Sequence, residues 1–283
     1  MRKIGILTLF QGNRNWGGVL QAYALKTLLE SNYADARVDL LLYRDGYSVV
    51  YPNRWRQMAQ YTPLEIIRQG RKRLAWRREA PRLQARLQTR NLLFVRFEQA
   101  CITNTRQYTS DNLMNAAREY DCLICGSDQI WNPNVARPGF FLTTVAHECV
   151  KIAYAASIAR EGLSLRERAV MMPLIARFDA ISVREKTAKV MLESDLPPGH
   201  PVVEALDPAL MLPRAQWEAL IRDITPMAEK YALAFFFADS LKTRRRIGAY
   251  CEANGLTLKT IPFAAQQYIA TDDQGDGERQ YDV

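Results

Sequence analysis

The chain has 283 residues, a net charge of +8 and 48% hydrophobic residues. This length suits one large domain or two ordinary ones, and the apolar content is enough for a packed core. No uncharged apolar run of about eighteen residues occurs, so no membrane-spanning helix is expected. The start, Met1-Arg2-Lys3, lacks the cleavage region of a secretory signal. Five cysteines without regular spacing are typical of a reducing compartment, so we expect a cytoplasmic protein.

The first elements predict a parallel sheet. Residues 3–10 form an apolar, β-branched run typical of a strand. A loop to Trp16, a helix over residues 19–30 and a strand over residues 37–43 should follow. This strand–loop–helix–strand order is a βαβ unit. The expected fold is therefore α/β, with Rossmann-like parallel-sheet domains.

The positive charge is concentrated in one segment. Residues 54–96 contain twelve basic and two acidic residues, a local charge of +10, which leaves −2 on the rest of the chain. With Pro63 near the start and Pro81 as an interruption, residues 62–100 predict two helices, within a basic helical insertion spanning about residues 54–100.

Nucleic acid, an anionic membrane surface or an acidic sugar could bind the basic segment, or it could be a solvated helical face. Trp55 and Trp76 lie among the arginines, a mixture that suits a membrane interface as well as RNA. The sequence shows no motif of the common nucleic-acid-binding modules. We therefore expect peripheral membrane contact through residues 54–96, and we regard nucleic acid as the less favoured partner.

The remaining pattern predicts alternating helices and strands. Ser164 and Glu167 have the spacing of a capping box that begins a helix, which Pro173 should kink. The other expected elements are helices at 112–119, 185–193, 214–224 and 241–253, and strands at 122–125, 151–158, 181–183, 202–206, 232–238 and 257–262. A proline-rich stretch at residues 197–201 suggests a first domain at 1–205 and a partial second domain at 206–283.

A tract of small and polar residues follows the strand at residues 122–125. The turn formed by Gly126, Ser127 and Asp128 should leave backbone N–H groups available beyond the carboxyl end of that strand, where open α/β sheets bind ligands. Asp128 itself could cap a helix or act as a base or acceptor contact. Cys122 and Cys125 have zinc or redox spacing but no second pair, so we expect buried free thiols and no metal site.

A second glycine-containing turn joins the first strand to the first helix. Gly12 and Gly17 have the spacing of a phosphate loop, but the lysine and serine or threonine of such a loop do not follow. Gly18 is adjacent, and the segment could let the backbone approach an anion or could simply be a tight turn. No dinucleotide-binding glycine pattern is present.

Other candidate residues lie at later strand ends. Arg184 follows the strand at residues 181–183 and could form a fork onto a carboxylate or phosphate, or an ordinary salt bridge. Asp207 could form the turn before Pro208, or it could act as a base or contact the acceptor substrate. His147 and His200 are the only histidines, and neither has a second ligand at metal spacing.

Three segments, taken in order, carry a family resemblance. They are Ile4 to Phe10 with Asn13-x-Asn15-Trp-Gly-Gly-Val-Leu-Gln-Ala-Tyr-Ala24; Gly126-Ser-Asp-Gln-Ile-Trp131; and Tyr154-Ala-Ala-Ser157 with Ser182-Val-Arg-Glu185 and Leu206-Asp-Pro-Ala-Leu-Met-Leu212. In this order and spacing the sequence resembles the polysaccharide pyruvyl transferase family.

The resemblance implies a two-lobe, GT-B-like arrangement and an activity. Members of the family move the pyruvyl group of phosphoenolpyruvate onto two hydroxyls of one sugar as a ketal, so phosphoenolpyruvate would be the donor substrate and no cofactor is expected. The partner would be a sugar, or a lipid-linked or nucleotide-linked glycan. The family's arginine that holds the donor maps onto Arg184. The resemblance further implies substrate contacts at Asn15, Trp16, Gly17, Gly18, Gly126, Ser127 and Asp128.

One feature departs from the family. Members carry a histidine in a Ser-Phe-His-Gly-like motif of the second domain, and neither His147 nor His200 has that context. The catalytic residue therefore stays unassigned, with Asp128 as a candidate, and we expect a truncated second lobe with little activity. Two alternatives stay open: a nucleotide-sugar glycosyltransferase of the same fold, and a non-catalytic module that binds anionic surfaces.

Overall fold

The computed structural model describes most of the chain. The described residues are 1–10, 15–44, 46–53, 56, 58, 61–79, 81, 84–101, 107–145, 148–221, 227–236 and 241–262. The expected turn at residues 11–14, His147 and the residues after 262 lie outside them. Within the described residues, no helix is both long and apolar enough to cross a bilayer.

The chain divides into two compact units. The first consists of Met1–Asn13, Gly17–Ile66 and Glu98–Leu212, and the second of Arg14–Trp16, Ile67–Phe97 and Pro213–Val283. In the later part of the chain, the first unit therefore ends at Leu212. The sequence patterns had predicted this boundary at residue 205. Most of the basic insertion is grouped with the second unit.

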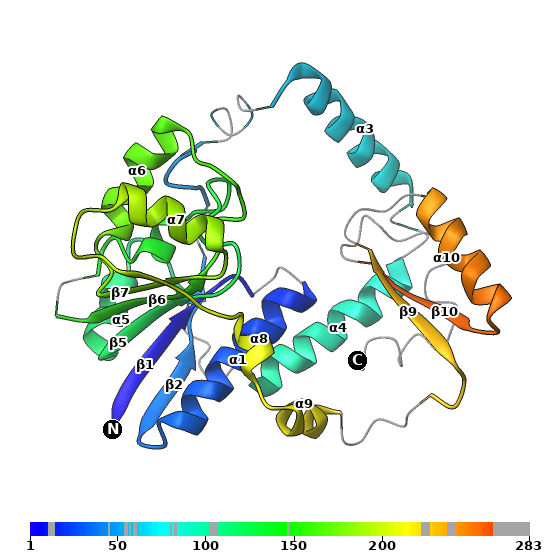
Figure 1. The fold of residues 1–283 in the computed structure, drawn as a ribbon, viewed down its shortest axis with the longest axis horizontal. Helices are drawn as coiled ribbons and strands as arrows, with labels where there is room; N and C mark the ends of the chain where they lie inside the picture. The colour runs from blue at the N-terminus through cyan, green and yellow to red at the C-terminus, as the bar shows by residue number, and fades with distance from the viewer. Residues whose placement is uncertain are drawn as a thin grey trace. The chain divides into compact units, whose positions relative to one another are not determined.

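A parallel sheet of six strands forms the centre of the first unit (Figure 1). Its order is β2-β1-β5-β6-β7-β8, and every pairing between neighbours is parallel. The strands are β1 (Arg2–Leu7), β2 (Ala36–Leu40), β5 (Cys122–Gly126), β6 (Val150–Ala156), β7 (Ala180–Val183) and β8 (Val202–Glu204). The expected α/β class with a parallel sheet is confirmed.

Helices cover both faces of this sheet. Helix α1 (Trp16–Asn32) packs Ala22 and Leu25 against Ile4 and Ile6 of β1. Helices α5 (Leu113–Glu119), α6 (Leu165–Ile175) and α7 (Lys186–Asp195) pack on the other face. Successive residues of a strand point to opposite faces of the sheet, and β1 and β5 are nearly continuous apolar runs. Both faces are therefore apolar at these strands, as expected for a sheet that helices cover on both sides.

Local signals place several of these elements. The capping box at the start of α6 is confirmed: Ser164 N donates to Glu167 Oε2 at 2.7 Å, and Glu167 N donates to Ser164 Oγ at 3.3 Å. Pro173 lies inside that helix. The two helices expected in the basic insertion are α3 (Pro63–Glu79) and α4 (Gln84–Cys101).

A small parallel pair was not expected from the sequence. Strands β3 (Leu42–Tyr43) and β4 (Gln107–Tyr108) pair beside a short 3-10 helix, η2 (Pro138–Phe141). Gly139 N donates to the hydroxyl of Tyr43 at 2.9 Å, and a Cβ on Gly139 would lie 2.3 Å from the Tyr43 ring. The close approach of ring and backbone explains the glycine.

After the first sheet, α8 (Pro208–Met211) and α9 (Arg214–Leu220) follow. In the second unit, β9 (Tyr231–Phe236) and β10 (Thr257–Pro262) form a parallel pair, connected in sequence through α10 (Leu241–Ala253). These elements match the order expected for a second α/β unit.

Candidate functional site

The topology of the first sheet places one crevice. Strand β1 lies between β2 and β5, so the chain leaves β1 toward one side through α1 and returns on the other side in β5. Ligands of open α/β sheets bind outside the carboxyl ends of the strands at such a reversal. The two turns singled out in the sequence, before Gly18 and after Gly126, follow these two neighbouring strands.

Buried hydrogen bonds tie the two turns together. Thr8, just after β1, donates from Oγ1 to the carbonyl oxygen of Ser127 at 3.0 Å. Gln21 of α1 donates from Nε2 to Thr8 Oγ1 at 2.9 Å and to the carbonyl of Gly18 at 2.8 Å. Among the described residues, the other amide atom of Gln21, Oε1, is buried without a hydrogen-bond partner. The bonds of Thr8 and Gln21 fix the start of α1 relative to the end of β5.

Gly18 is required by a close backbone approach. A Cβ at this position would lie 2.5 Å from the carbonyl oxygen of Leu9, and 3.4 Å from Oδ2 of Asp128. Any side chain would therefore push the start of α1 away from the loop that follows β1. The glycine keeps the helix start close to the Asp128 carboxylate.

Asp207 connects three parts of the crevice. Its Oδ2 accepts from Ser127 Oγ at 2.9 Å and from Arg184 Nη1 at 2.6 Å. Its Oδ1 accepts from Ala209 N at 3.0 Å, which caps α8. The side chain therefore joins the residues that follow β5 and β7 to the start of α8. Arg184, considered as a donor-binding fork or an ordinary salt bridge, forms an ion pair in this structure.

A strand irregularity positions the next residue of the crevice. The β6–β7 register shifts between Ala153 and Ala156, and Ala155 has a left-handed φ of 48°. Ser182 of β7 supports this bulge: its Oγ accepts from Ala155 N at 2.9 Å and donates to the carbonyl of Ala153 at 3.1 Å. Bulges redirect the residues that follow them, and they are frequent beside functional sites.

Ser157 follows the bulge and contacts both neighbouring strand ends. Its backbone N–H donates to the carbonyl of Asp128 at 3.0 Å, and its Oγ donates to Oε1 of Glu185 at 2.5 Å. The same Glu185 oxygen lies 3.6 Å from Nε of Arg184. Asp128, Ser157 and Glu185 are thus joined across β5, β6 and β7.

The site is rich in carboxylates. Asp128, Glu185 and Asp207 surround one described arginine, Arg184, which gives this group a formal charge of −2 at neutral pH. Burial raises the pKa of Asp128 above its ordinary value, while the N–H of Gln129 and the charge of Arg184 act in the opposite direction. Carboxylates accept hydrogen bonds from hydroxyls, and Arg184 offers donors to an anion.

Asp128 does not cap a helix, contrary to one of the two roles considered from sequence. The chain continues in turns after β5, and Asp128 has a left-handed φ of 71°. Its Oδ1 accepts from the next backbone N–H, that of Gln129, at 2.8 Å. Within the described part of the chain, no donor is bonded to Oδ2, the oxygen beside Gly18. Non-glycine residues in this conformation are uncommon and cluster at functional sites.

The other residues expected to contact substrate lie at the start of α1 or have a packing role. Trp16 packs its ring on Phe94 of α4, with the centroids 4.5 Å apart, and Asn15 and Gly17 flank it at the start of α1. Gly126 has a packing role, because a Cβ there would lie 2.6 Å from Leu25 of α1. The structure therefore brings together Gly18, Ser127, Asp128 and Arg184.

Three residues of the crevice were not named as sites from sequence. Ser157 and Glu185 each follow a parallel strand, so the rule that singled out Arg184 applied to them as well. Tyr154 of β6 donates from its hydroxyl to Met211 Sδ at 2.8 Å. Burial raises the pKa of Tyr154, and the negative charge of Asp207 raises it further. No local pattern identifies Tyr154, because its contacts come from residues more than fifty positions away.

The remaining chemically reactive side chains lie elsewhere. His200 places its two ring nitrogens beside the carbonyls of Pro197 and Ala176, at 3.1 and 2.9 Å. Cys122 and Cys125 are free thiols on β5, and their odd spacing directs them to opposite faces. Among the described residues, no group of three or more His, Cys, Asp or Glu is arranged to hold a metal ion.

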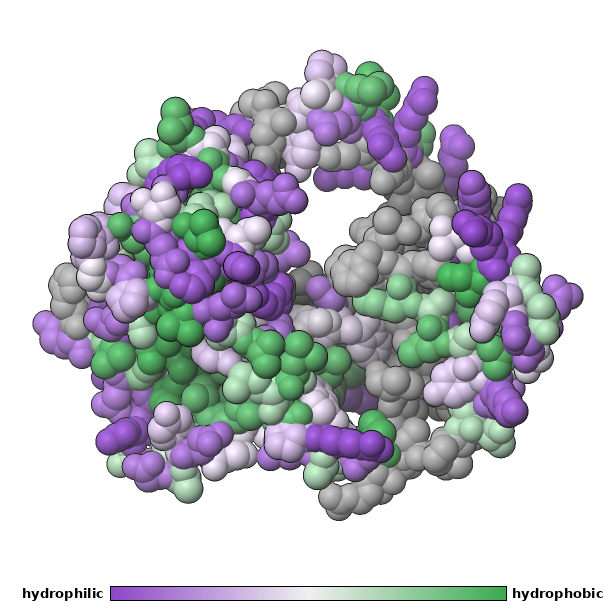
Figure 2. All heavy atoms as spheres, in the orientation of Figure 1, coloured by the Kyte–Doolittle hydropathy of each residue, from purple (hydrophilic) through white to green (hydrophobic). Residues whose placement is uncertain are grey.

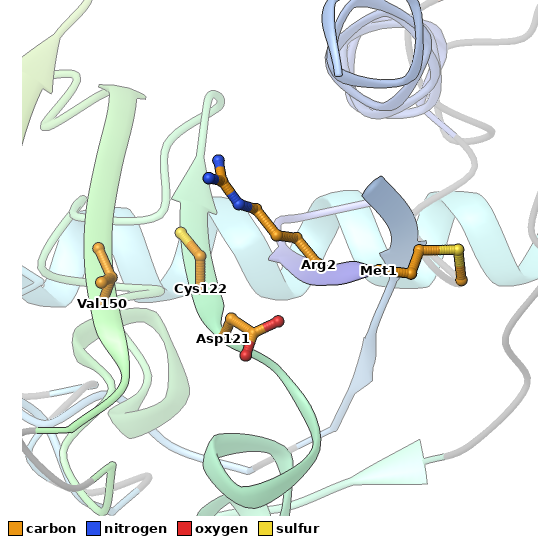
Figure 3. Close-up of a pocket in the computed structure, with 5 residues that line it drawn as sticks. All are labelled: Met1, Arg2, Asp121, Cys122 and Val150. Atoms are coloured by element: carbon orange, nitrogen blue, oxygen red, sulfur yellow. The ribbon is translucent and has the colours of Figure 1, made fainter. Parts of the chain in front are cut away.

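A surface hollow lies at the opposite edge of the sheet, at the amino ends of β1, β5 and β6 (Figure 3). It is lined by Met1, Arg2, Asp121, Cys122 and Val150. Burial raises the pKa of the Cys122 thiol to about 12, so it stays protonated and weakly nucleophilic. Because ligands of parallel sheets bind at the carboxyl ends, this hollow is not the candidate site.

One of the comparisons with known proteins identifies a family. The family model described as "Polysaccharide pyruvyl transferase" matches residues 15–276. No curated protein matches the sequence significantly. Among solved structures, the chain is similar to a UDP-GlcNAc 2-epimerase from Neisseria meningitidis bound to UDP-GlcNAc, with 9% identity and a TM-score of 0.42 over 99% of this chain and 68% of the epimerase chain. Because the family model covers nearly the whole sequence, the chain belongs to the polysaccharide pyruvyl transferase family.

Proposed function

We propose that this protein transfers the pyruvyl group of phosphoenolpyruvate to two hydroxyls of a sugar in a glycan, forming a ketal. The supporting observation is the Ser127–Asp207–Arg184 connection across the carboxyl ends of the strands, beside Asp128. It combines carboxylates, which can accept hydrogen bonds from sugar hydroxyls, with one guanidinium group, which can donate hydrogen bonds to an anion. The donor is a co-substrate, and the reaction as proposed requires no further cofactor.

The charges suggest how the two substrates divide this site. Phosphoenolpyruvate carries a carboxylate and a phosphate, so three carboxylates repel it and Arg184 attracts it. Sugar hydroxyls, in contrast, are neutral donors that carboxylates bind well. We therefore assign Asp128 and Glu185 to the acceptor hydroxyls and Arg184 to the anionic donor.

The reaction balances without a redox partner. The two sugar oxygens form bonds to the central carbon of the donor, whose bond to the phosphate oxygen breaks. One hydroxyl proton ends on the methylene carbon, which becomes a methyl group, and the other leaves with inorganic phosphate. Asp128 is proposed as the base that accepts a hydroxyl proton, because burial raises its pKa and makes its carboxylate a stronger base.

Localisation follows from the same proposal. Phosphoenolpyruvate is a metabolite found inside cells. The thiols of Cys122, Cys125 and Cys149 are free. Free buried thiols suit a reducing compartment. We place the proposed reaction in the cytoplasm, on a glycan or its lipid-linked or nucleotide-linked precursor.

Donor binding is tested by titrating the full chain with phosphoenolpyruvate, using calorimetry. Arg184→Gln should weaken binding roughly 10- to 100-fold, the usual effect of losing hydrogen bonds to a charged group. Arg168→Gln is the matched control, since Arg168 forms a comparable ion pair with Asp195 between α6 and α7, at 2.5 and 2.6 Å. Absence of donor binding by the unmodified chain, or equal weakening by both substitutions, would contradict the assignment.

The role of Asp128 is tested separately. With a glycan acceptor, Asp128→Asn should lower the turnover number roughly 10²- to 10⁴-fold, the range expected for loss of a general base. Its affinity for phosphoenolpyruvate should not fall, because the substitution removes a negative charge. Ketal formation is followed by the new methyl signal in proton NMR. Unchanged turnover in Asp128→Asn would exclude the proposed base.

A further inference from the structure

Helix α3 is specified by its own sequence. Thr62 and Glu65 form a capping box: Thr62 N donates to Glu65 Oε2 at 2.7 Å, and Glu65 N donates to Thr62 Oγ1 at 3.3 Å. The bonds that the Glu65 carboxylate accepts from the Thr62 N–H and the Thr62 hydroxyl lower the pKa of Glu65. Pro63 occupies the first helical position, where its fixed φ and missing N–H are favourable. The start of the helix thus requires no contact from distant parts of the chain.

The side chains of α3 that the structure describes are not covered by other parts of the chain. Every described side chain of the helix is exposed, including Leu64 at 76%, Ile67 at 55% and Leu74 at 54%. An isolated helix of this length is only marginally stable in water, so helices usually bury an apolar stripe. With Ile66 at 39%, four large aliphatic side chains are exposed on this one helix, and such exposed apolar residues often mark an interaction surface.

These aliphatic residues share a face with arginines. At 100° per residue, Leu64, Ile67, Arg71, Leu74 and Arg78 fall within a sector of about 80°. We call these five residues the α3 stripe. Figure 2 shows hydrophobic and hydrophilic residues mixed on the visible face of α3. The whole helix has six basic and two acidic residues, and one of the acidic residues, Glu65, is bonded back to Thr62.

The composition of the stripe selects among possible partners. A second copy of the basic segment would be repelled by its like charge. Binding to single-stranded nucleic acid relies on aromatic side chains that stack on bases, whereas the stripe is aliphatic. Leucine and isoleucine insert at the boundary of headgroups and acyl chains, while arginines extend to the phosphates.

We propose that the α3 stripe docks on a membrane surface that contains anionic phospholipids. The helix would lie in the plane of the interface, with Leu64, Ile67 and Leu74 toward the acyl chains. Arg71 and Arg78 would contact lipid phosphates. This inference concerns a surface outside the strand-end crevice, and it holds whether or not the chain transfers pyruvyl groups.

The test is co-sedimentation of the full chain with vesicles. Vesicles of pure phosphatidylcholine are compared with vesicles that contain one third phosphatidylglycerol, at low and high salt. Binding should require phosphatidylglycerol and weaken as salt increases. Equal binding to both kinds of vesicle, or no binding to either, would overturn the proposal.

Two double variants separate charge from apolar insertion. Arg71→Gln with Arg78→Gln should weaken vesicle binding roughly 30-fold, the effect of losing two basic residues near an anionic surface. Leu64→Gln with Leu74→Gln should weaken it at least about tenfold, because aliphatic burial is lost. The matched control is Arg245→Gln with Arg246→Gln on α10, where both arginines are exposed; it should bind like the unmodified chain.

Each outcome decides the question. If the α10 variant weakens binding as much as the α3 variant, the interaction depends on total charge and the stripe is not the docking surface. If a single-stranded RNA binds through Arg71 and Arg78 while vesicles do not bind, the partner is nucleic acid. Circular dichroism at 222 nm on every variant ensures that a loss of binding is assigned only to a folded protein.

Discussion

Ser127 and Arg184 donate hydrogen bonds to the same oxygen of Asp207, Oδ2, at 2.9 and 2.6 Å. They follow different strands, β5 and β7, and Asp207 lies more than twenty residues beyond Arg184. The shared acceptor holds the residues that follow β5 and β7 and the start of α8 in one arrangement. Its removal should therefore affect both stability and ligand binding.

Asp207→Asn should lower the free energy of unfolding by about 1–2 kcal/mol. The ion pair is partly exposed, so its loss should lie between the small effect of a surface pair and the larger effect of a buried one. Asparagine can still cap α8. Urea unfolding followed by circular dichroism measures the change. Asp195→Asn, which breaks the Arg168 pair, should cost a similar amount.

The same two variants should differ in their binding of phosphoenolpyruvate. Asp207→Asn removes a negative charge beside Arg184 and should tighten binding several-fold, whereas Asp195→Asn should leave it unchanged. Calorimetric titration gives both affinities. A similar change in the two variants would show that the affinity responds to stability alone.

Gly18→Ala should destabilise the protein by about 1–3 kcal/mol. The new Cβ would lie 2.5 Å from the carbonyl of Leu9, and a backbone atom cannot move aside as a flexible side chain can. Gly70→Ala in α3 is the control, since nothing lies within 4 Å of its Cβ. That substitution should increase helix stability by about 0.5–1 kcal/mol. Denaturant midpoints that move in the same direction for both would contradict the packing explanation.

Gly126 should prove to be a packing position coupled to Leu25. Gly126→Ala places a Cβ 2.6 Å from Leu25 Cδ2, which is the end of a rotatable side chain, so it should cost about 1 kcal/mol, less than Gly18→Ala. In a Leu25→Val background the same substitution should cost less, because the shorter side chain leaves room. A double-mutant cycle measured by urea unfolding gives this coupling. Strict additivity would mean that the contact does not limit position 126.

Asp128→Asn should stabilise the fold at neutral pH. The folded state raises the pKa of Asp128, so over the interval between the unfolded and folded pKa values the folded protein binds more protons, and its stability falls as pH rises. The ionised carboxylate is therefore unfavourable above the raised pKa, and asparagine removes that effect. Unfolding measured from pH 7 downward should show the advantage of asparagine shrinking as Asp128 becomes protonated.

Backbone conformation provides a control at the same position. Asparagine tolerates a φ of 71°, but alanine does not, so Asp128→Ala should be about 1–2 kcal/mol less stable than Asp128→Asn. If both variants were equally stable, the left-handed conformation would not be what restricts residue 128.

Ser182→Ala should loosen the bulge in β6. The hydroxyl bonds both Ala155 N and the carbonyl of Ala153, and its loss leaves these groups without that partner at a cost of about 1–3 kcal/mol. Amide hydrogen exchange should accelerate at Ala155 and Ser157 and stay unchanged in β1. Uniform acceleration across the sheet would instead indicate a general loss of stability.

Much of the fold follows from patterns within short segments. Apolar runs, the spacing of Ser164 and Glu167, and the order of strands and helices predicted the parallel α/β class and most elements of both units. These features depend on periodicity and on capping, which act over a few residues. The strand predicted at residues 37–43 is divided into β2 and β3 in the structure. Strand β4 and its pairing with β3 were not predicted, because a two-residue strand shows no periodicity.

The motifs also predicted most residues of the candidate site. The rule that ligands lie beyond the carboxyl ends of parallel strands predicted a site at Ser127, Asp128 and Arg184, and the structure places these residues near one another at those strand ends. Their binding of substrate stays a prediction. What the sequence could not show is which of these side chains already have partners. Arg184 is bonded to Asp207, and Gly126 makes room for Leu25.

The amino-acid sequence by itself thus determined the class of fold and the family, and it predicted the edge of the sheet that holds the candidate site. Only the tertiary structure decided the charge of the crevice, the left-handed turn at Asp128 and the bulge that places Ser157. The reason is physical: strand periodicity and caps are local, whereas an ion pair or a steric limit arises between residues that the chain brings together only when it folds.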